Sequence, residues 1–261
     1  MADEQPETPR APGRDYFDRW YADMTSSPAK DAILQRHLRI PPALGSAGVL
    51  HWDALDEIAA ELRLPAGALL LDVACGRGGY GVELARRLDV ALVGVDFSAV
   101  ALGAARNVAA RHLPSGRADF RLGTLLASGL PSGLADGLVC TDSVQFAEPP
   151  LEALRELRRV LRPGGRLALT AWQATTPGDP RVKARVRHLD LARDLEAAGL
   201  VDVVVEPRPA WRAAERAVAE EAVAAPDGDH DAALRSLQEE SRETLATFDA
   251  LQRVVAFATA P

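Results

Sequence analysis

The chain has 261 residues, of which 48% are hydrophobic and 26% charged, so it can bury a full core without disulfide or metal staples. Its formal net charge of −7 disfavours nucleic acids and anionic membranes as partners, and no apolar run reaches the roughly 18 residues that a membrane-spanning helix needs. Cys75 and Cys140 lie in apolar runs that predict reduced thiols and a cytoplasmic protein, and no His or Cys spacing indicates a metal site.

The N-terminal part of the chain is predicted to be helical after a disordered tail. Residues 1–14 are acidic and proline-rich and lack an apolar core, which is typical of disorder rather than of a signal peptide. Residues 15–64 are expected to form a helical cap, because apolar side chains recur there at helical spacing. Its helices are expected at residues 14–24, at 27–38 with Ser27 as the N-terminal cap, and at 51–64.

Residues 65–261 are expected to form the main domain, because short apolar strands alternate with amphipathic helices from this point onward. This alternation predicts βαβ units and a parallel sheet with right-handed crossovers. Strands are expected at 68–75, 90–97, 119–126, 134–142 and 165–172, with helices at 80–88, 98–112 and 150–161. A helix at 187–200, a strand at 201–207, a helical insertion at about 208–249 and a strand at 251–260 follow. The predicted fold is a Rossmann-like, seven-stranded, mostly parallel α/β sheet flanked by helices.

A glycine-rich turn follows the first predicted strand of this sheet. Gly76, Gly78 and Gly81 in "LLLDVACGRGGYGVELARRL" fit G-x-G-x-x-G, which predicts a tight turn that lets a ligand approach the backbone. Asp72, near the end of that strand, would repel a pyrophosphate but suits a ligand with an ammonium or sulfonium group. Asp96 ends the second strand, where a carboxylate can accept hydrogen bonds from both hydroxyls of a ribose.

Four motifs occur in order: "LLLDVACGRGGYGVELA", "VGVDFS", "VCTDSVQF" and "LRELRRVLRPGGRLALTAW". With them, the stretch from Leu69 to Trp172 resembles the class I S-adenosylmethionine-dependent methyltransferases. The flanks resemble, more loosely, the small-molecule members found in bacterial natural-product pathways. The resemblance implies S-adenosylmethionine as the cofactor and a small molecule as the substrate.

The resemblance also implies a cofactor site along the carboxyl edge of the sheet. Its residues are expected to be Asp72, Ala74, Cys75, Gly76 and Gly78 at the methionine part, Asp96 at the ribose, Phe97 and Ser98 beside the adenine, and Thr141 and Ser143 along the cofactor. Thr124 stands where family members usually carry an acid for the adenine amino group, so the Leu125 backbone is expected to make that contact.

Three residues are candidates for catalysis. His51 begins the helix before the sheet, in a region that often closes over the active site of similar proteins; the alternative is a solvated helix-start residue. Asp142 follows the fourth strand and would either orient the substrate or cap the next turn. The resemblance implies that Gln145 and Phe146 point at the substrate.

Aromatic side chains outside the motifs predict the wall of an apolar pocket. Trp20 and Tyr21, on the aromatic face of the first helix, would cover cofactor and substrate or simply pack in the core. Trp172 ends the fifth strand and Trp211 opens the helical insertion, so both are candidates for the substrate wall. Trp52, beside His51, is the remaining candidate.

The predicted function is S-adenosylmethionine-dependent methylation of a small, largely apolar metabolite, most readily at oxygen, with carbon and nitrogen left open. The alternative is a methyltransferase-fold cyclase or rearrangement enzyme that uses the bound cofactor, or its demethylated product, as a scaffold. The presence of both Asp72 and Asp96 disfavours a non-catalytic binding module, and Asp72 disfavours a nicotinamide oxidoreductase. The sequence leaves monomer and homodimer equally open.

Overall fold

The computed structural model describes residues 13–24, 27–45, 48–226 and 230–261, so nearly all of the tail expected at 1–14 lies outside the described residues. Among these residues, seven strands form one sheet with the order β3-β2-β1-β4-β5-β7-β6. The strands are β1 (Leu69–Val73), β2 (Ala91–Asp96), β3 (Ala118–Leu122), β4 (Ala135–Thr141), β5 (Leu161–Ala174), β6 (Val201–Pro207) and β7 (Leu251–Thr259). Neighbouring strands are parallel, except that β7 runs antiparallel to both β5 and β6. The predicted fold class is confirmed.

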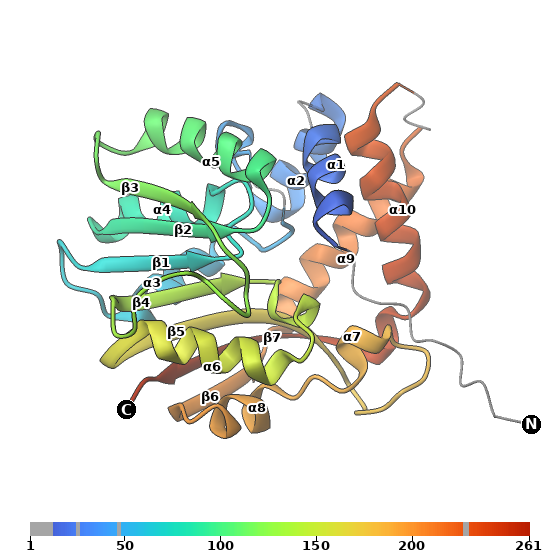
Figure 1. Cartoon of the computed structure of the whole chain (residues 1–261). Coiled ribbons are helices and arrows are strands. Elements are labelled where there is room, and N and C mark those ends of the chain that lie inside the picture. Colours follow the sequence, from blue (N-terminus) through green and yellow to red (C-terminus); the bar gives the residue numbers. More distant parts are fainter. Residues whose placement is uncertain (1–12, 25–26, 46–47, 227–229) are drawn as a thin grey trace, which may run out of the picture.

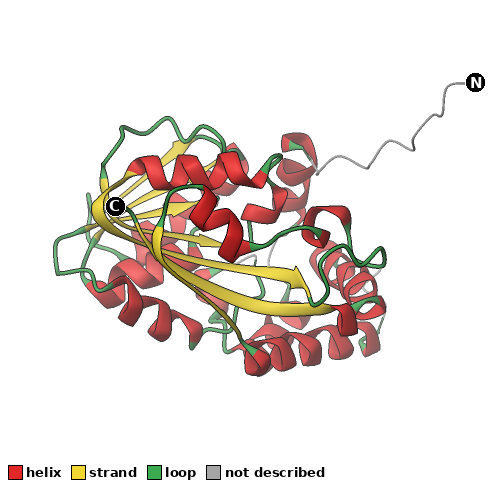
Figure 2. Cartoon of the chain, turned by 90° about the horizontal axis from the view of Figure 1, so that it is seen from below, coloured by secondary structure: helices red, strands yellow, loops and turns green. Residues whose placement is uncertain are grey.

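Helices cover both faces of this sheet (Figure 2). Buried side chains of one face pack against α3 (Ala54–Leu62), α4 (Gly79–Leu88) and α5 (Ala99–His112). Those of the other face pack against α6 (Pro150–Val160) and α8 (Leu191–Ala197). The two apolar cores follow from the near-continuous apolar runs of the central strands, which are buried on both faces as parallel sheets require.

A group of helices lies beside one edge of the sheet, where α1 (Arg14–Asp23), α9 (Pro209–Ala224) and α10 (Ala232–Ala246) meet (Figure 1). The Trp20 indole N–H donates to Ser236 Oγ at 2.9 Å and so joins α1 to α10. The remaining elements are α2 (Pro28–Leu38), α7 (Ala184–Arg187) and the short 3-10 turns η1 (Pro42–Leu44), η2 (Val144–Phe146) and η3 (Phe248–Ala250). None of the described helices combines the length and apolarity that crossing a membrane requires.

Three predicted boundaries were wrong for local reasons. β3 ends at Leu122, not at residue 126, because the chain turns at Gly123, where a Cβ would lie 2.7 Å from Val95 Cγ1. The helix expected at 187–200 begins only at Leu191, where Asp190 caps α8 by accepting the Arg193 N–H at 3.1 Å. β5 already begins at Leu161, and a register shift in its pairing with β4 absorbs the Pro-Gly-Gly turn.

Candidate active site

A cavity of about 690 Å³ opens at the carboxyl ends of β1, β2 and β4. One side of it consists of the loops that follow these strands, and the other side of α1, α7, α9 and α10. In open α/β sheets ligands bind at this edge, where the order of the strands reverses. The strand order here reverses at β1, between β2 and β4.

The glycine turn after β1 exposes backbone atoms to the cavity that no side chain covers. Gly76 and Gly78 have positive φ angles of 52° and 79°, and Ala74, with a φ of 59°, adopts the same left-handed conformation. A Cβ on Gly78 would lie 2.9 Å from Ala105 Cβ, and one on Gly81 would lie 2.9 Å from Asp72 Cβ. The chain therefore requires glycine at these positions, and the backbone of residues 74–78 is open to a ligand.

Two buried carboxylates lie side by side at this end of the cavity. Asp72 and Asp96 are each 3% exposed. Burial, and then the charge of Asp96, raise the pKa of Asp72 to about 7, and burial also raises the pKa of Asp96. A cationic ligand would relieve the repulsion between the two acids, whereas a pyrophosphate would increase it.

Asp96 is held in place by the backbone. Its Oδ2 accepts the Gly76 N–H at 2.8 Å and its Oδ1 accepts the Ser98 N–H at 2.9 Å. An ionised carboxylate offers about four acceptor positions, so two remain for further donors such as a pair of hydroxyls. This geometry fits the ribose contact predicted for Asp96.

Helix α1 covers the same end of the cavity. The Tyr21 hydroxyl lies 2.7 Å from where a Cβ of Gly76 would stand. The Phe17 ring packs edge-on against Phe97 and Phe146, with ring centroids 5.5 and 5.6 Å apart. Burial and the nearby acids raise the pKa of Tyr21 beyond its usual range, so its hydroxyl stays protonated and serves as a hydrogen-bond donor.

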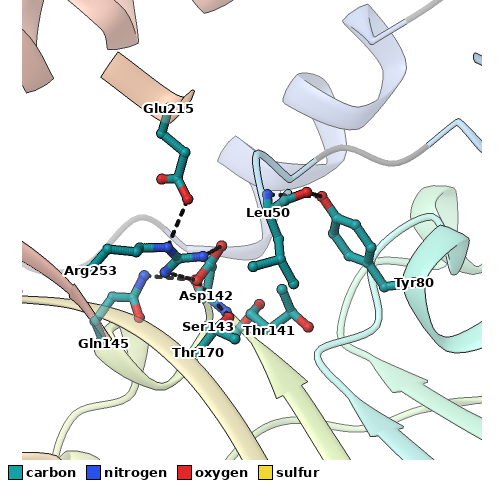
Figure 3. Close-up of polar contacts among 9 residues, drawn as sticks. All are labelled: Leu50, Tyr80, Thr141, Asp142, Ser143, Gln145, Thr170, Glu215 and Arg253. Carbon is teal, nitrogen blue, oxygen red and sulfur yellow. Dashed lines mark hydrogen bonds and ion pairs between the residues drawn. The ribbon is translucent and has the colours of Figure 1, made fainter. Parts of the chain in front are cut away.

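A buried charged cluster joins Asp142 and Glu215, which line the cavity, to Arg253 (Figure 3). Both terminal nitrogens of Arg253 on β7 donate to the carboxylate of Asp142, one of them at 2.7 Å. The Arg253 Nε donates to Glu215 Oε1 on α9 at 2.8 Å, and Thr170 Oγ1 donates to Asp142 Oδ1 at 2.8 Å. Arg253 has no exposed side-chain surface, and the Glu215 side chain is 4% exposed.

Every buried side-chain polar atom that lacks a partner among the described residues belongs to a residue that lines this cavity. These atoms are Thr141 Oγ1, Gln145 Oε1, Arg185 Nε and Glu215 Oε2. Leaving a buried polar group unpaired costs free energy, so such atoms indicate where a ligand supplies the missing partner. These atoms, the glycine turn after β1 and the neighbouring carboxyl groups of Asp72 and Asp96 suit a cofactor that has a cationic centre and polar groups. They also leave polar atoms for a second molecule beside it.

The structure brings most of the predicted site residues to this one cavity. The cofactor candidates that line it are Asp72, Ala74, Cys75, Gly76, Gly78, Asp96, Phe97, Thr124, Leu125, Thr141 and Ser143. The catalytic and substrate candidates that line it are Asp142, Gln145, Trp20, Tyr21, Phe146 and Trp172. Their roles in binding remain predictions.

Four predicted site residues are not among those that line the cavity: His51, Trp52, Ser98 and Trp211. His51 Nδ1 accepts the Asp53 N–H at 3.2 Å at the start of α3. Trp52 and Trp211 pack in the apolar core. Ser98 is fully buried because it caps α5, accepting the Ala101 N–H at 3.1 Å while its hydroxyl donates to Asp18 of α1.

Two further predictions need adjustment. Thr124 is in the cavity wall, but its Oγ1 already accepts the Ala127 N–H at 3.0 Å within a turn. Asp142 also lies in the wall, but Arg253 occupies both of its carboxylate oxygens, so it is poorly placed to act as a base.

Neither Glu215 nor Arg253 was predicted from the sequence as a site residue. Glu215 lies in a charged helix that reads as a solvated face, and nothing in that pattern marks one glutamate as buried. Arg253 carried a signal, because an arginine in an otherwise apolar strand must find a partner when the strand is buried.

The comparisons with known proteins agree with this geometry. A family model described as a methyltransferase domain matches residues 70–165. The 27-O-demethylrifamycin SV methyltransferase of Amycolatopsis mediterranei is 30% identical over 181 residues, which cover 62% of this chain and 66% of that protein. The O-methyltransferase resE of Aspergillus sclerotiorum is 28% identical over 135 residues, 51% of each chain. The alignments span less than two thirds of the length of these relatives.

Solved structures share the fold along nearly the whole chain. The geranyl diphosphate C-methyltransferase of Streptomyces coelicolor A3(2), in complex with S-adenosyl-L-homocysteine, matches with a TM-score of 0.67 and 15% identity over 100% of both chains. The [4+2]-cyclase SpnF matches with a TM-score of 0.69 and 21% identity over 98% of this chain and 99% of that chain. At these identities the structures show the fold alone. Residues 70–165 thus match a methyltransferase domain, the related sequences include methyltransferases, and solved methyltransferases share the fold, in agreement with the S-adenosylmethionine cofactor expected from the sequence.

Proposed function

We propose that this protein transfers the methyl group of S-adenosylmethionine to a hydroxyl of a small, largely apolar metabolite. The observation that carries the proposal is the continuity of the cavity: one space joins the acidic, glycine-lined edge of the sheet to a compartment under α9 and α10. A cofactor at Asp72 and Asp96 would therefore share this space with a second molecule.

The second compartment has an aromatic and aliphatic wall. Trp172 and Phe248 pack edge-on with ring centroids 5.5 Å apart, and Phe146 lies under the Arg185 guanidinium at 4.8 Å from its ring centroid. Val182, Val218 and Leu237 complete the apolar part of the wall. Such a surface supports an apolar or aromatic acceptor, because a flat ring buries a large apolar area against it.

The cofactor supplies the electrophilic methyl group, and the residues of this chain align the acceptor and exclude water from it. Holding two reactants in line can lower the barrier by about 7–11 kcal/mol. Helix α1 contributes to that exclusion, because Tyr21 and Phe17 line the cavity beside the glycine turn and Phe97. Related proteins named as O-methyltransferases support oxygen as the acceptor atom.

The proposal is tested in two steps. S-adenosylhomocysteine at a hundredfold excess over its Kd should stabilise the protein by about 2.7 kcal/mol, and NAD should not. The matched variant Asp96→Asn should weaken the response to S-adenosylhomocysteine, because it removes the charge that accepts the ribose hydroxyls.

The second step incubates the protein with methyl-labelled cofactor and a library of phenols, alcohols and amines. Transfer of label to a hydroxyl supports the proposal, and transfer to nitrogen or carbon would correct the acceptor atom. The shared fold of the cyclase SpnF motivates a third readout. Turnover of a library compound without label transfer would refute methylation and favour a cyclase or rearrangement enzyme.

A further inference from the structure

The cluster of Asp142, Arg253 and Glu215 carries one positive charge for two carboxyl groups. Asp142 receives two hydrogen bonds from Arg253 and one from Thr170, so its charge is fully compensated. Glu215 receives one hydrogen bond from the Arg253 Nε, and the Trp172 indole also lies within hydrogen-bonding reach of its carboxyl group. Protonation of Glu215 would therefore disturb fewer hydrogen bonds than protonation of Asp142.

Glu215 lies in the wall of the cavity. Its Oε2 is buried and receives no hydrogen bond from Arg253, while the Trp172 indole lies within reach of the carboxyl group. The groups that face Glu215 are Arg253 on β7, Asp142 at the end of β4 and the Trp172 indole on β5. Burial is the largest influence and raises the pKa of Glu215 to about 8, against the opposing effect of Arg253.

We propose that Glu215 is the proton acceptor of the methyl transfer, with Oε2 as the basic atom and with Arg253, held by Asp142, as the residue that positions it. This inference rests on the proposed function and narrows its substrate to acceptors with an acidic hydroxyl, such as phenols and enols. An acceptor that is already nucleophilic, such as a neutral amine, has no need of a base at this position.

The hydroxyl oxygen of the acceptor forms a bond to the methyl carbon while the carbon–sulfur bond breaks, and the electron pair of that bond remains on sulfur. The hydroxyl proton passes to Glu215 Oε2. The products are the methyl ether, neutral S-adenosylhomocysteine and a protonated Glu215, so no further reactant is required.

The decisive variant is Glu215→Gln. Its Oε1 can still accept from Arg253, so the fold of the cluster is kept, but an amide replaces the basic oxygen. With the best phenolic acceptor of the library, we expect kcat to fall by roughly 10²–10⁴-fold. With the cofactor saturating at every pH, the rise of kcat/KM for the acceptor up to about pH 8 in the natural protein should be lost, while the Kd of S-adenosylhomocysteine should stay within about twofold.

Glu220→Gln is the matched control, because Glu220 is an exposed residue of the same helix whose partner is Arg216. It should leave both kcat and the pH profile unchanged. If the natural protein methylates a phenol and Glu215→Gln keeps its rate and its pH profile, the role of Glu215 is refuted while the proposed function stands. Failure of the natural protein to methylate any compound counts against the proposed function instead.

An infrared titration makes the inference testable without an acceptor. With S-adenosylhomocysteine bound, a protonated carboxyl band of the natural protein should disappear as the pH rises through about 8 and should be missing in Glu215→Gln at all pH values. A spectrum that is identical in both proteins would overturn the assignment, because it would show that Glu215 does not exchange a proton in the working range.

Discussion

The charge of Asp72 should control how tightly the cofactor binds. Because the pKa of Asp72 is raised to about 7, its carboxyl is about 3% ionised at about pH 5.5 and about half ionised at about pH 7.0. If the cation binds only the ionised form, the apparent Kd scales inversely with the ionised fraction. S-adenosylmethionine should therefore bind about sixteenfold more tightly at the higher pH, a difference of about 1.6 kcal/mol.

Titration calorimetry at the two pH values measures this change directly. The sulfonium charge is permanent, so the ligand itself does not account for it. Asp72→Asn should bind more weakly at the higher pH and should show a nearly flat dependence. Its amide oxygen can still accept the Gly81 N–H that the carboxylate accepts.

Two controls separate the effect of Asp72 from other titrations. 5′-Methylthioadenosine has the ribose and adenine of the cofactor but neither cationic group, so its affinity should be nearly independent of pH in this range. Because the pKa of Asp72 is raised in the folded protein, the contribution of Asp72 to the free energy of unfolding falls as pH rises from about 3.8 to about 7. Above that range Asp72→Asn should therefore unfold no more easily than the natural protein. Equal pH slopes in the natural protein and in Asp72→Asn would refute the reasoning.

The remaining predictions concern packing around the cavity. Gly81→Ala forces a Cβ against Asp72 and should weaken S-adenosylhomocysteine binding at least about tenfold in titration calorimetry. Gly103→Ala is the control, because a Cβ there meets nothing within 4 Å, and it should leave the affinity unchanged. Ser98→Ala should cost about 1 kcal/mol of unfolding free energy in urea titrations, because it removes the cap of α5. Arg253→Met removes the positive partner of two buried carboxyl groups and should lower the free energy of unfolding by about 3–5 kcal/mol in the same titrations. A loss below about 1 kcal/mol would show that the cluster is not a tight ion pair.

The sheet and the cofactor end of the cavity were predictable because both are encoded locally. Each central strand is a short apolar run, and Asp72, Gly76 and Gly78 lie within a few residues of one strand end. Parallel strands align their carboxyl ends at the same edge of a sheet, so Asp96 was expected beside Asp72 from chain order alone. Site residues whose partners lie nearby in the sequence form a pattern that can be recognised in one sequence.

The other end of the cavity is assembled from distant segments. Arg253 and Asp142 are 111 residues apart in the sequence, and Arg253 and Glu215 are 38 apart. Trp211, four positions before Glu215 on the same helix, packs in the core, although an aromatic residue at the start of the insertion looked like the better candidate for the substrate. Spacing along α9 predicts which residues share a face, but it does not say which face meets the cavity.

The two acidic ends of the cavity have complementary tasks in the proposed reaction. Before transfer, Asp72 and Asp96 would hold a cofactor that carries a positive charge on its sulfonium, and Glu215 must be ionised to take a proton. After transfer, the sulfur is neutral and a proton lies on Glu215, so one positive charge has moved across the cavity. Burial raises the pKa of Asp72 to about 7 and that of Glu215 to about 8, so both acids ionise in neighbouring pH ranges. Burial thus raises the free energy of both ionised carboxyl groups. For the same reason the ionisation of each carboxyl group is sensitive to a charge that is added or removed beside it.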